Sequence, residues 1–290
     1  MNDSNGKLNV SFNAEEGISM KIAICNEMFE GWKIEDVFEY VSEIGYEGVE
    51  IAPFTISNDV RNVERKKREE IRSLASSFNL EIVGTHWLLI TPKGLHLTHP
   101  DENVRRLTEH YLCELIKFTS DIGGRILVFG SPDQRSILKR VSFRKAWNYA
   151  KEIFHACSRF AEDYDAVIAI EPLAKFLTNF INTAEEAIRL IEEVSHPNFR
   201  LNLDVYSMLD EGKPLPEIIK SSREYLVHFH INDDNKLGPG FGKVNFKPII
   251  GALKEINYDR FISVEAFDFS PGPKRIASVS LETLRNLLRA

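Results

Sequence analysis

The feature that most restricts the fold of this chain is a regular alternation of short β-rich runs with longer amphipathic segments. From residue 20 to residue 290 the alternation repeats eight times, so one strand and one helix together take about 34 residues. The expected strands are the runs 21–26, 48–53, 81–87, 125–130, 166–171, 199–204, 225–230 and 261–265. Because eight such units close a parallel barrel of about 250 residues, the pattern predicts a single (β/α)8 barrel of the α/β class.

Capping residues mark the ends of several expected helices. A helical run of apolar residues stops at Gly45, which is typical of a C-cap. Asp101 can cap a long helix that continues to about Ile122. Thr183 and Glu186, three residues later, have the spacing of a capping box. These signals place helices between the expected strands.

The alternative architecture is a doubly wound open sheet, which usually has a glycine-rich turn after its first strand. Here the first strand continues as CNEMFEGW (25–32), without such a turn. No linker or low-complexity segment interrupts the chain, so we expect one catalytic domain at 20–290. Residues 1–19 have no basic start and no apolar stretch of signal-peptide length, and we expect them to be a polar N-terminal extension.

Composition excludes several classes of partner. The net charge of −7 and the pI of about 5.7 do not favour a nucleic-acid ligand. No run approaches the ~20 apolar residues of a membrane span, so no membrane partner is expected. The three cysteines, Cys25, Cys113 and Cys157, are widely spaced and predict no disulfide framework. A reducing, cytoplasmic location is the simplest expectation.

Four consecutive expected strands end on side chains that can bind a metal. These residues are Glu171, Asp204, His230 and Glu265, separated by 33, 26 and 35 residues. They therefore occupy equivalent places on successive β-α units, at the carboxyl ends of the strands. In a (β/α)8 barrel the active site is at that end.

Any one of these four residues alone is as well explained by a structural role, such as capping a helix or pairing at the rim. As a set, three buried carboxylates would repel one another unless a cation neutralised them. Three oxygen ligands and one imidazole predict one divalent ion. Mn²⁺ is the first expectation, followed by Mg²⁺ or Co²⁺, and Zn²⁺ is compatible.

Other polar residues are expected near the same end of the barrel. His86 closes the third expected strand and predicts a contact with the substrate, with a structural role as the alternative. Asn235 belongs to a polar loop after His230 that can orient the imidazole or a ligand. Glu50 follows an apolar run and is expected inside the barrel, paired with a base such as Lys21.

Several of these segments together resemble the sugar isomerase/epimerase family with a xylose-isomerase-like TIM barrel, and most closely its ketose 3-epimerases. The similarity lies in IEPLAKFLTNFINT (170–183), LNLDVYSM (201–208), HFHINDDNKLGPGFGKVNF (228–246) and ISVEAFDFSPGP (262–273), with GYEGVEI (45–51) and THWLL (85–89) in agreement. The resemblance implies a carbohydrate-like substrate and a homodimer or homotetramer.

The resemblance also implies a mechanism. Glu171, Asp204, His230 and Glu265 would hold the catalytic cation, and Glu171 and Glu265 would face each other across the bound sugar. One glutamate would remove the proton next to the carbonyl, and the other would return it on the opposite face, through a cis-enediolate.

Three positions depart from the family pattern. Leu177 stands where the 3-epimerases have a sugar-binding glutamate, Ser207 where they have a histidine, and Lys236 where they have an arginine. Lys236 keeps a cation for substrate binding but lacks the planar fork of arginine. The reaction type is therefore better supported than a free ketohexose as the substrate, and the expectation widens to small hydroxy-carbonyl compounds.

Three other functions stay open. An inosose-type dehydratase, a lyase, would use the same metal site and the same proton abstraction. An endonuclease-IV-like phosphodiester hydrolase would need further histidines, where this chain has LVFGSP (127–132), Ser207 and KVNF (243–246). A non-catalytic sugar-binding or metal-binding relative is the third.

Overall fold

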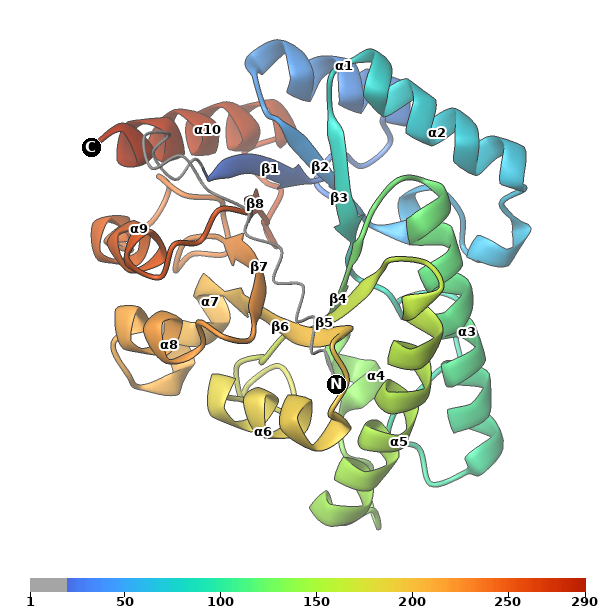
Figure 1. Cartoon of the computed structure of the whole chain (residues 1–290). Helices are drawn as coiled ribbons and strands as arrows, with labels where there is room; N and C mark the ends of the chain where they lie inside the picture. Colours follow the sequence, from blue (N-terminus) through green and yellow to red (C-terminus); the bar gives the residue numbers. More distant parts are fainter. Residues whose placement is uncertain (1–19) are drawn as a thin grey trace, which may run out of the picture.

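The computed structural model describes residues 20–290 and contains a closed barrel of eight parallel strands in chain order (Figure 1). The strands are β1 (Lys21–Cys25), β2 (Gly48–Ile51), β3 (Glu81–Thr85), β4 (Ile126–Phe129), β5 (Val167–Ile170), β6 (Phe199–Asp204), β7 (Leu226–Ile231) and β8 (Phe261–Val264). β8 pairs with β1 in parallel and closes the sheet. The predicted (β/α)8 barrel is therefore confirmed, and every strand boundary lies within two residues of its predicted position. The expected extension, residues 1–19, lies outside the described residues.

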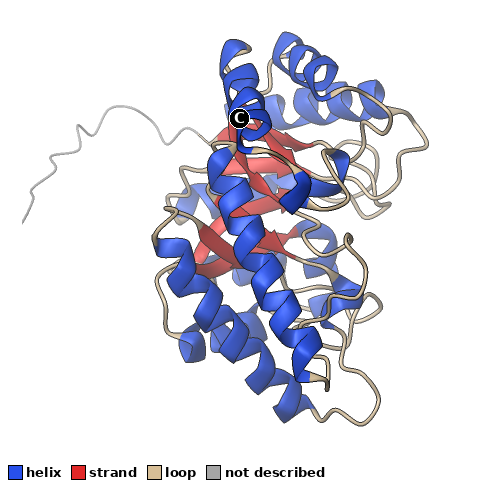
Figure 2. Ribbon diagram, turned by 90° about the vertical axis from the view of Figure 1, so that its right-hand side faces the viewer, coloured by secondary structure: helices blue, strands red, loops and turns tan. Residues whose placement is uncertain are grey.

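Helices surround the barrel, and the long loops that follow the strands gather at one of its ends (Figures 1 and 2). The α-helices are α1 (Ile34–Ile44), α2 (Arg65–Ser77), α3 (Glu102–Asp121), α4 (Pro132–Arg135), α5 (Phe143–Glu162), α6 (Ala184–Val194), α7 (Val205–Met208), α8 (Leu215–Ser221), α9 (Phe246–Glu255) and α10 (Pro273–Arg289). Short 3-10 helices are η1 (Pro53–Thr55), η2 (Val60–Asn62) and η3 (Leu209–Glu211). In the part of the chain that the structure describes, no helix has the length and apolar character needed to cross a membrane.

The predicted caps form as expected. The Asp101 carboxylate accepts a hydrogen bond from the backbone N–H of Asn103 at 2.9 Å and starts α3. Thr183 Oγ1 accepts from the N–H of Glu186 at 3.1 Å and starts α6, while the Glu186 side chain accepts from the N–H of Asn182 at 2.7 Å. These contacts satisfy backbone donors that a helix cannot satisfy internally.

The inside of the barrel and the layer between the strands and the helices contain different kinds of residue. Between strands and helices the residues are apolar, such as Ile24 and Ile51. Inside the barrel, Glu50 of β2 meets His228 of β7 across the lumen, at 2.7 Å between Oε2 and Nε2. Because β2 and β7 are not neighbours in the sheet, these side chains must point inward. The inside is thus polar, whereas most barrels of this kind fill it with branched aliphatic residues.

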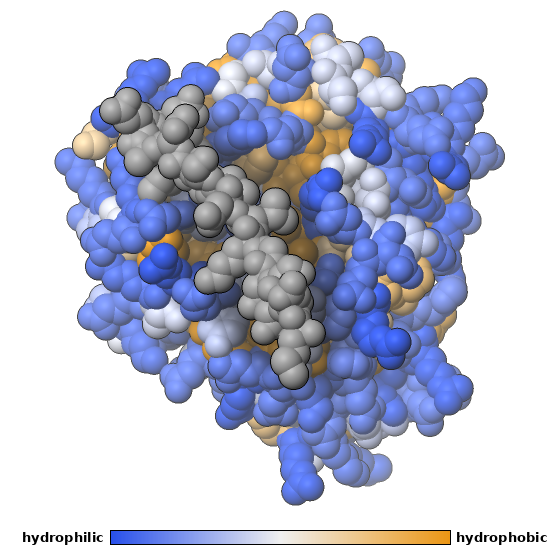
Figure 3. All heavy atoms as spheres, in the orientation of Figure 1, coloured by the Kyte–Doolittle hydropathy of each residue, from blue (hydrophilic) through white to orange (hydrophobic). Residues whose placement is uncertain are grey.

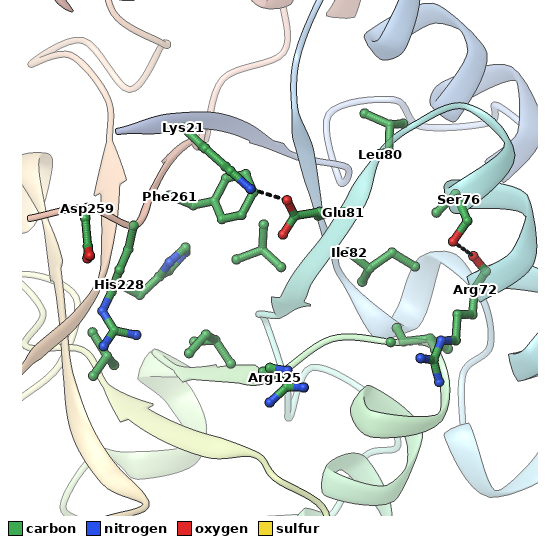
Figure 4. Close-up of a pocket in the computed structure, with 17 residues that line it drawn as sticks. Lys21, Arg72, Ser76, Leu80, Glu81, Ile82, Arg125, His228, Asp259 and Phe261 are labelled. Atoms are coloured by element: carbon green, nitrogen blue, oxygen red, sulfur yellow. Dashed lines mark hydrogen bonds and ion pairs between the residues drawn. The ribbon is translucent and has the colours of Figure 1, made fainter. Parts of the chain in front are cut away.

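A cavity of about 430 Å³ opens at the amino ends of the strands. Its lining includes Lys21, Glu81 and Phe261, each at the start of its strand, and His228 (Figure 4). Figure 3 shows apolar residues in the hollow at the centre of this face. The cavity therefore lies at the end of the barrel opposite to the predicted metal ligands.

Candidate metal centre

The four residues expected to bind a metal meet at the carboxyl ends of β5 to β8. Asp204 is the last residue of β6 and His230 the last but one of β7, while Glu171 and Glu265 each follow the last residue of their strand. One ligand atom of each lies within 4.8 Å of those of the other three. Their exposed fractions are 5% or less. The structure thus brings together all four residues that the strand ends indicated.

Asn232, two residues after His230, connects two of the loops at this centre. Its side-chain amide donates to Asp204 Oδ2 at 2.5 Å, and its Oδ1 accepts from the N–H of Tyr206 at 2.8 Å. Asp204 Oδ1 accepts from the N–H of Ser207 at 2.7 Å, so this carboxylate also caps α7. Both oxygens of Asp204 are therefore fixed in direction.

The cluster brings three buried carboxylates close together, and a bound cation would offset their negative charge. Burial raises the pKa of Glu171 well above its usual range, and the carboxylates of Glu265 and Asp204 raise it further. Burial, followed by the charge of Glu265, raises the pKa of Asp204 to about 6. For Glu265 burial acts in the same direction, but His230 and His86 hold its pKa below the usual range. Three carboxylates and an imidazole therefore fit a divalent cation of oxygen-preferring or borderline character.

Gly130 leaves room for the carboxylate of Glu171. A Cβ atom at Gly130, directly after β4, would lie 2.8 Å from Glu171 Oε2. A side chain at residue 130 would therefore require this carboxylate to shift from the position it has in the cluster. Glycine at this position thus permits close approach of the carboxylate, and no left-handed backbone angle is involved.

Beneath the cluster, Glu50 contacts the candidate histidine ligand, His230. His230 Nε2 lies 3.2 Å from Glu50 Oε1, while Nδ1 on the other side of the ring lies 2.9 Å from Glu265 Oε2. Such carboxylate–histidine pairs usually fix the ring of a metal ligand. Glu50 is buried as expected, but the expected pairing with Lys21 is wrong, because Lys21 pairs with Glu81 at the amino end of the barrel. The pairing of Glu50 with His230 could not be predicted from the sequence, because β2 and β7 are distant in the chain.

On another side of the cluster, His86 and Trp87 contact Glu265. His86 is 1% exposed, with Nδ1 at 3.4 Å from Glu265 Oε1 and Nε2 at 3.1 Å from Glu27 Oε2. The indole Nε1 of Trp87 donates to the same Glu265 oxygen at 2.9 Å. Both ring nitrogens of His86 therefore face carboxylates. Glu27, in the loop after β1, was not recognised in the sequence.

The other two residues expected at the substrate, Asn235 and Lys236, are exposed on the loop after β7. The Asn235 amide donates to the carbonyl of Phe241 at 2.9 Å, so its side chain stabilises the loop itself. The Lys236 carbonyl accepts from the N–H groups of Phe267 and Asp268 at 2.8 and 3.1 Å, which joins this loop to the one after β8. The structure places both residues outside the buried cluster.

Arg135 is a further buried residue that sequence reasoning missed. It lies on α4, is fully buried, and donates to the carbonyls of Glu171 and Ile181 at 2.7 and 2.8 Å. Burial, opposed by the charge of Glu171, lowers the pKa of its guanidinium to about 9. Arg135 thus holds the chain segment that carries Glu171.

Comparison with known proteins identifies distant relatives. Residues 38–287 match the family described as "Xylose isomerase-like TIM barrel". D-psicose 3-epimerase of Ruminiclostridium cellulolyticum is 25% identical over 79% of this chain and 76% of that relative. 3-Dehydro-D-guloside 4-epimerase of Escherichia coli is 24% identical over 92% of this chain and 99% of that relative.

Solved structures agree on the fold. A crystal structure of D-psicose 3-epimerase with D-tagatose from Clostridium cellulolyticum H10 superposes with a TM-score of 0.82. The sequence identity is 21%, over 93% of this chain and 99% of that chain.

Proposed function

Because the chain belongs to the xylose isomerase-like TIM barrel family, as its sequence predicted, we propose that it is a metal-dependent sugar epimerase or isomerase. The observation that carries the proposal is the buried cluster of Glu171, Asp204, His230 and Glu265, whose ligand atoms lie within 4.8 Å of one another. The relatives are sugar epimerases, which supports the same class of reaction here.

In this proposal Glu171, Asp204, His230 and Glu265 hold one divalent cation, with Mn²⁺ as the proposed ion because oxygen donors outnumber nitrogen. When bound, such an ion polarises a carbonyl and its neighbouring hydroxyl. It thereby acidifies the C–H bond of the carbon that carries this hydroxyl. Glu50 keeps the ring of His230 in the orientation that presents Nδ1 to the cluster.

Glu171 and Glu265 are the proposed proton-transfer groups. One carboxylate removes the proton next to the carbonyl and becomes protonated, which gives an enediolate. The other, in its protonated form, delivers its own proton to the opposite face. Glu265 is suited to this because His86, Trp87 and His230 fix both of its oxygens. Glu171 comes from β5, and the space over Gly130 admits its carboxylate. The buried position of both groups excludes bulk water.

The substrate class is proposed only in general terms, as a sugar or a related hydroxy-carbonyl compound. Direct contacts of His86, Asn235 and Lys236 with the substrate stay predictions. So do a cytoplasmic location, assembly into a homodimer or homotetramer, and the division into an extension at 1–19 and a catalytic domain at 20–290.

Deuterium exchange tests the proposal. The Mn²⁺-loaded protein is incubated in D2O with ketoses, inososes and 2-keto acids, and NMR follows the proton beside each carbonyl. We expect solvent deuterium at that carbon, with the exchange abolished in Glu265→Gln and kept in Glu39→Gln, a change on the exposed face of α1.

Four other results would lead to different conclusions. Absence of exchange with every compound, or exchange by Glu265→Gln at the rate of the unaltered protein, contradicts the proposal. Exchange accompanied by loss of water identifies a dehydratase. Cleavage of abasic DNA without exchange identifies a nuclease.

A further inference from the structure

Exposed apolar side chains gather near the candidate metal centre. Among the described residues, five large hydrophobic side chains are exposed, and three of them lie in the segments that follow β5 and β6: Phe176 (62%), Leu177 (37%) and, on η3, Leu209 (42%). These two strands lead to Glu171 and Asp204. The N–H of Lys175 donates to Asp210 Oδ2 at 2.8 Å. This contact therefore joins the two segments that carry the exposed apolar side chains.

Aromatic rings continue from this surface to the cluster itself. The aromatic row consists of Phe54, Trp87, Phe267, Tyr206 and Phe176, from the segments that follow β2, β3, β8, β6 and β5; Phe54 lies on η1 and Tyr206 on α7. Successive centroids are 6.0, 6.5, 5.8 and 5.8 Å apart. In the inner part of the row, Trp87 Nε1 donates a hydrogen bond to Glu265. Phe176, at the outer end, is largely exposed. The row thus connects the buried cluster with the rim.

The exposed side chains of this surface offer no hydrogen-bonding partner to the hydroxyl groups of a free sugar. Every carbon of a ketohexose carries oxygen, and its hydroxyl groups need hydrogen-bonding partners when they leave water. Phe176, Leu177 and Leu209 offer only hydrocarbon. A flat aromatic or aliphatic group would bury this surface and stack on the rings. The cluster needs a hydroxy-carbonyl group at the inner end of the row, and the rim fits an apolar group at the outer end.

We propose that the substrate is an aryl glycoside of a keto sugar, with the sugar ring over the metal cluster and the aryl group against Phe176 and Leu177. The inference rests on the proposed function and adds a substrate class to it. Phe176 and Leu177 are then specificity-determining residues that form an aglycone subsite.

The test compares three groups of substrates with the Mn²⁺-loaded protein: phenyl 3-keto-glucosides, the matching methyl 3-keto-glucosides, and free ketohexoses. Deuterium exchange gives kcat/KM for each. We expect the phenyl compound to exceed the methyl compound about tenfold, mainly through a lower KM, as one aromatic stacking contact allows. In Phe176→Ser the ratio of phenyl to methyl should fall to about one. Leu107→Ser, a change at an exposed apolar residue of α3 (44%), should keep the ratio.

Other outcomes overturn the inference in distinguishable ways. Equal kcat/KM for the phenyl and methyl compounds, or a ratio that survives Phe176→Ser, refutes the aglycone subsite and leaves the proposed function intact. If Phe176→Ser converts a dimer into monomers without changing the ratio, the apolar surface is an interface between copies of this chain. No exchange with any compound refutes the proposed function, and the substrate class with it.

Discussion

Trp87 has a backbone conformation that is rare for a bulky residue. Its φ of 53° lies in the left-handed region, where side chains other than glycine are disfavoured. The same residue directs its indole Nε1 at Glu265 Oε1, 2.9 Å away. Strained residues of this kind gather where the surrounding structure uses their position. We therefore expect Trp87 to fix the proposed base, Glu265.

Replacing Trp87 with Phe tests this role, because it keeps an aromatic ring and removes the donor. Loss of a hydrogen bond to a charged group predicts a fall in kcat of about ten- to a hundredfold, with a smaller change in KM. Trp147→Phe is the matched control, since its Nε1 donates to Glu193 at the same distance of 2.9 Å, on the helices outside the barrel. Equal losses in the two variants would assign Trp87 a purely structural role.

Glu50→Gln tests the orientation of His230. The substitution keeps the size of the buried side chain but replaces a carboxylate that contacts both His228 and His230. Changes to partners of this kind typically weaken metal binding about 10- to 100-fold. Calorimetric titration with Mn²⁺ measures the effect, with Glu81→Gln at the amino end of the barrel as the control. An unchanged affinity in Glu50→Gln would remove Glu50 from the metal centre.

At the scale of single residues, the sequence predicted which residues could bind a metal, but not which side chains contact them. Glu171, Asp204, His230 and Glu265 were recognisable because each ends a strand of a regular series, and parallel strands bring their ends together. The pairing of Glu27 with His86 depends on contacts between distant segments. Spacing along the chain carries no signal for such contacts.

At the scale of strands and helices, the long regular elements were predictable from the sequence and the short ones were not. The strands and long helices follow from periodicity and caps, which are local properties. The helices α4 and α7 have four residues each, too few to show a helical period, and they were not predicted. Arg135 on α4 and the cap of α7 by Asp204 were therefore also missed, although both help to fix the candidate ligands.

In the loop between β3 and α3, protonation of His96 should make the free energy of unfolding depend on pH. Burial, with a smaller contribution from His99, lowers the pKa of His96 to about 4. Its Nδ1 accepts from the N–H of Thr98 at 3.3 Å, a contact that protonation of this nitrogen breaks. Because the unfolded chain binds this proton more readily, His96 should favour folding above its ordinary pKa and lose that effect as the pH falls toward 4.

The corresponding variant is His96→Asn, whose side chain can still accept from Thr98. Its Tm should fall less than that of the unaltered protein between pH 7 and pH 4.5, measured by circular dichroism. His110→Asn, on an exposed face of α3, should behave like the unaltered protein. The same acid sensitivity in His96→Asn and the unaltered protein would contradict this assignment.

For the whole molecule, the candidate ligands come from β5, β6, β7 and β8, which are half of the barrel. An ion that binds only the folded chain stabilises it by about 2.7 kcal/mol at a hundred times its Kd. For a chain of this size that predicts a rise in Tm of about 5 °C. Because protons compete for Asp204, with its pKa near 6, and for the other ligands, the rise should be larger at pH 8 than at pH 5.5.

Differential scanning calorimetry with and without Mn²⁺ measures this shift, and Asp204→Asn should reduce it. A rise in Tm that is unaffected by Asp204→Asn would indicate binding elsewhere on the molecule.

A crystal structure of the protein grown with Mn²⁺, with anomalous diffraction data, tests the central claim most directly. The account predicts one anomalous peak in the barrel, within bonding distance of Glu171, Asp204, His230 and Glu265, with the carboxylates of Glu171 and Glu265 facing a common space. A structure without a peak among these four residues, or with the ion bound at Glu27 and His86 instead, would contradict it.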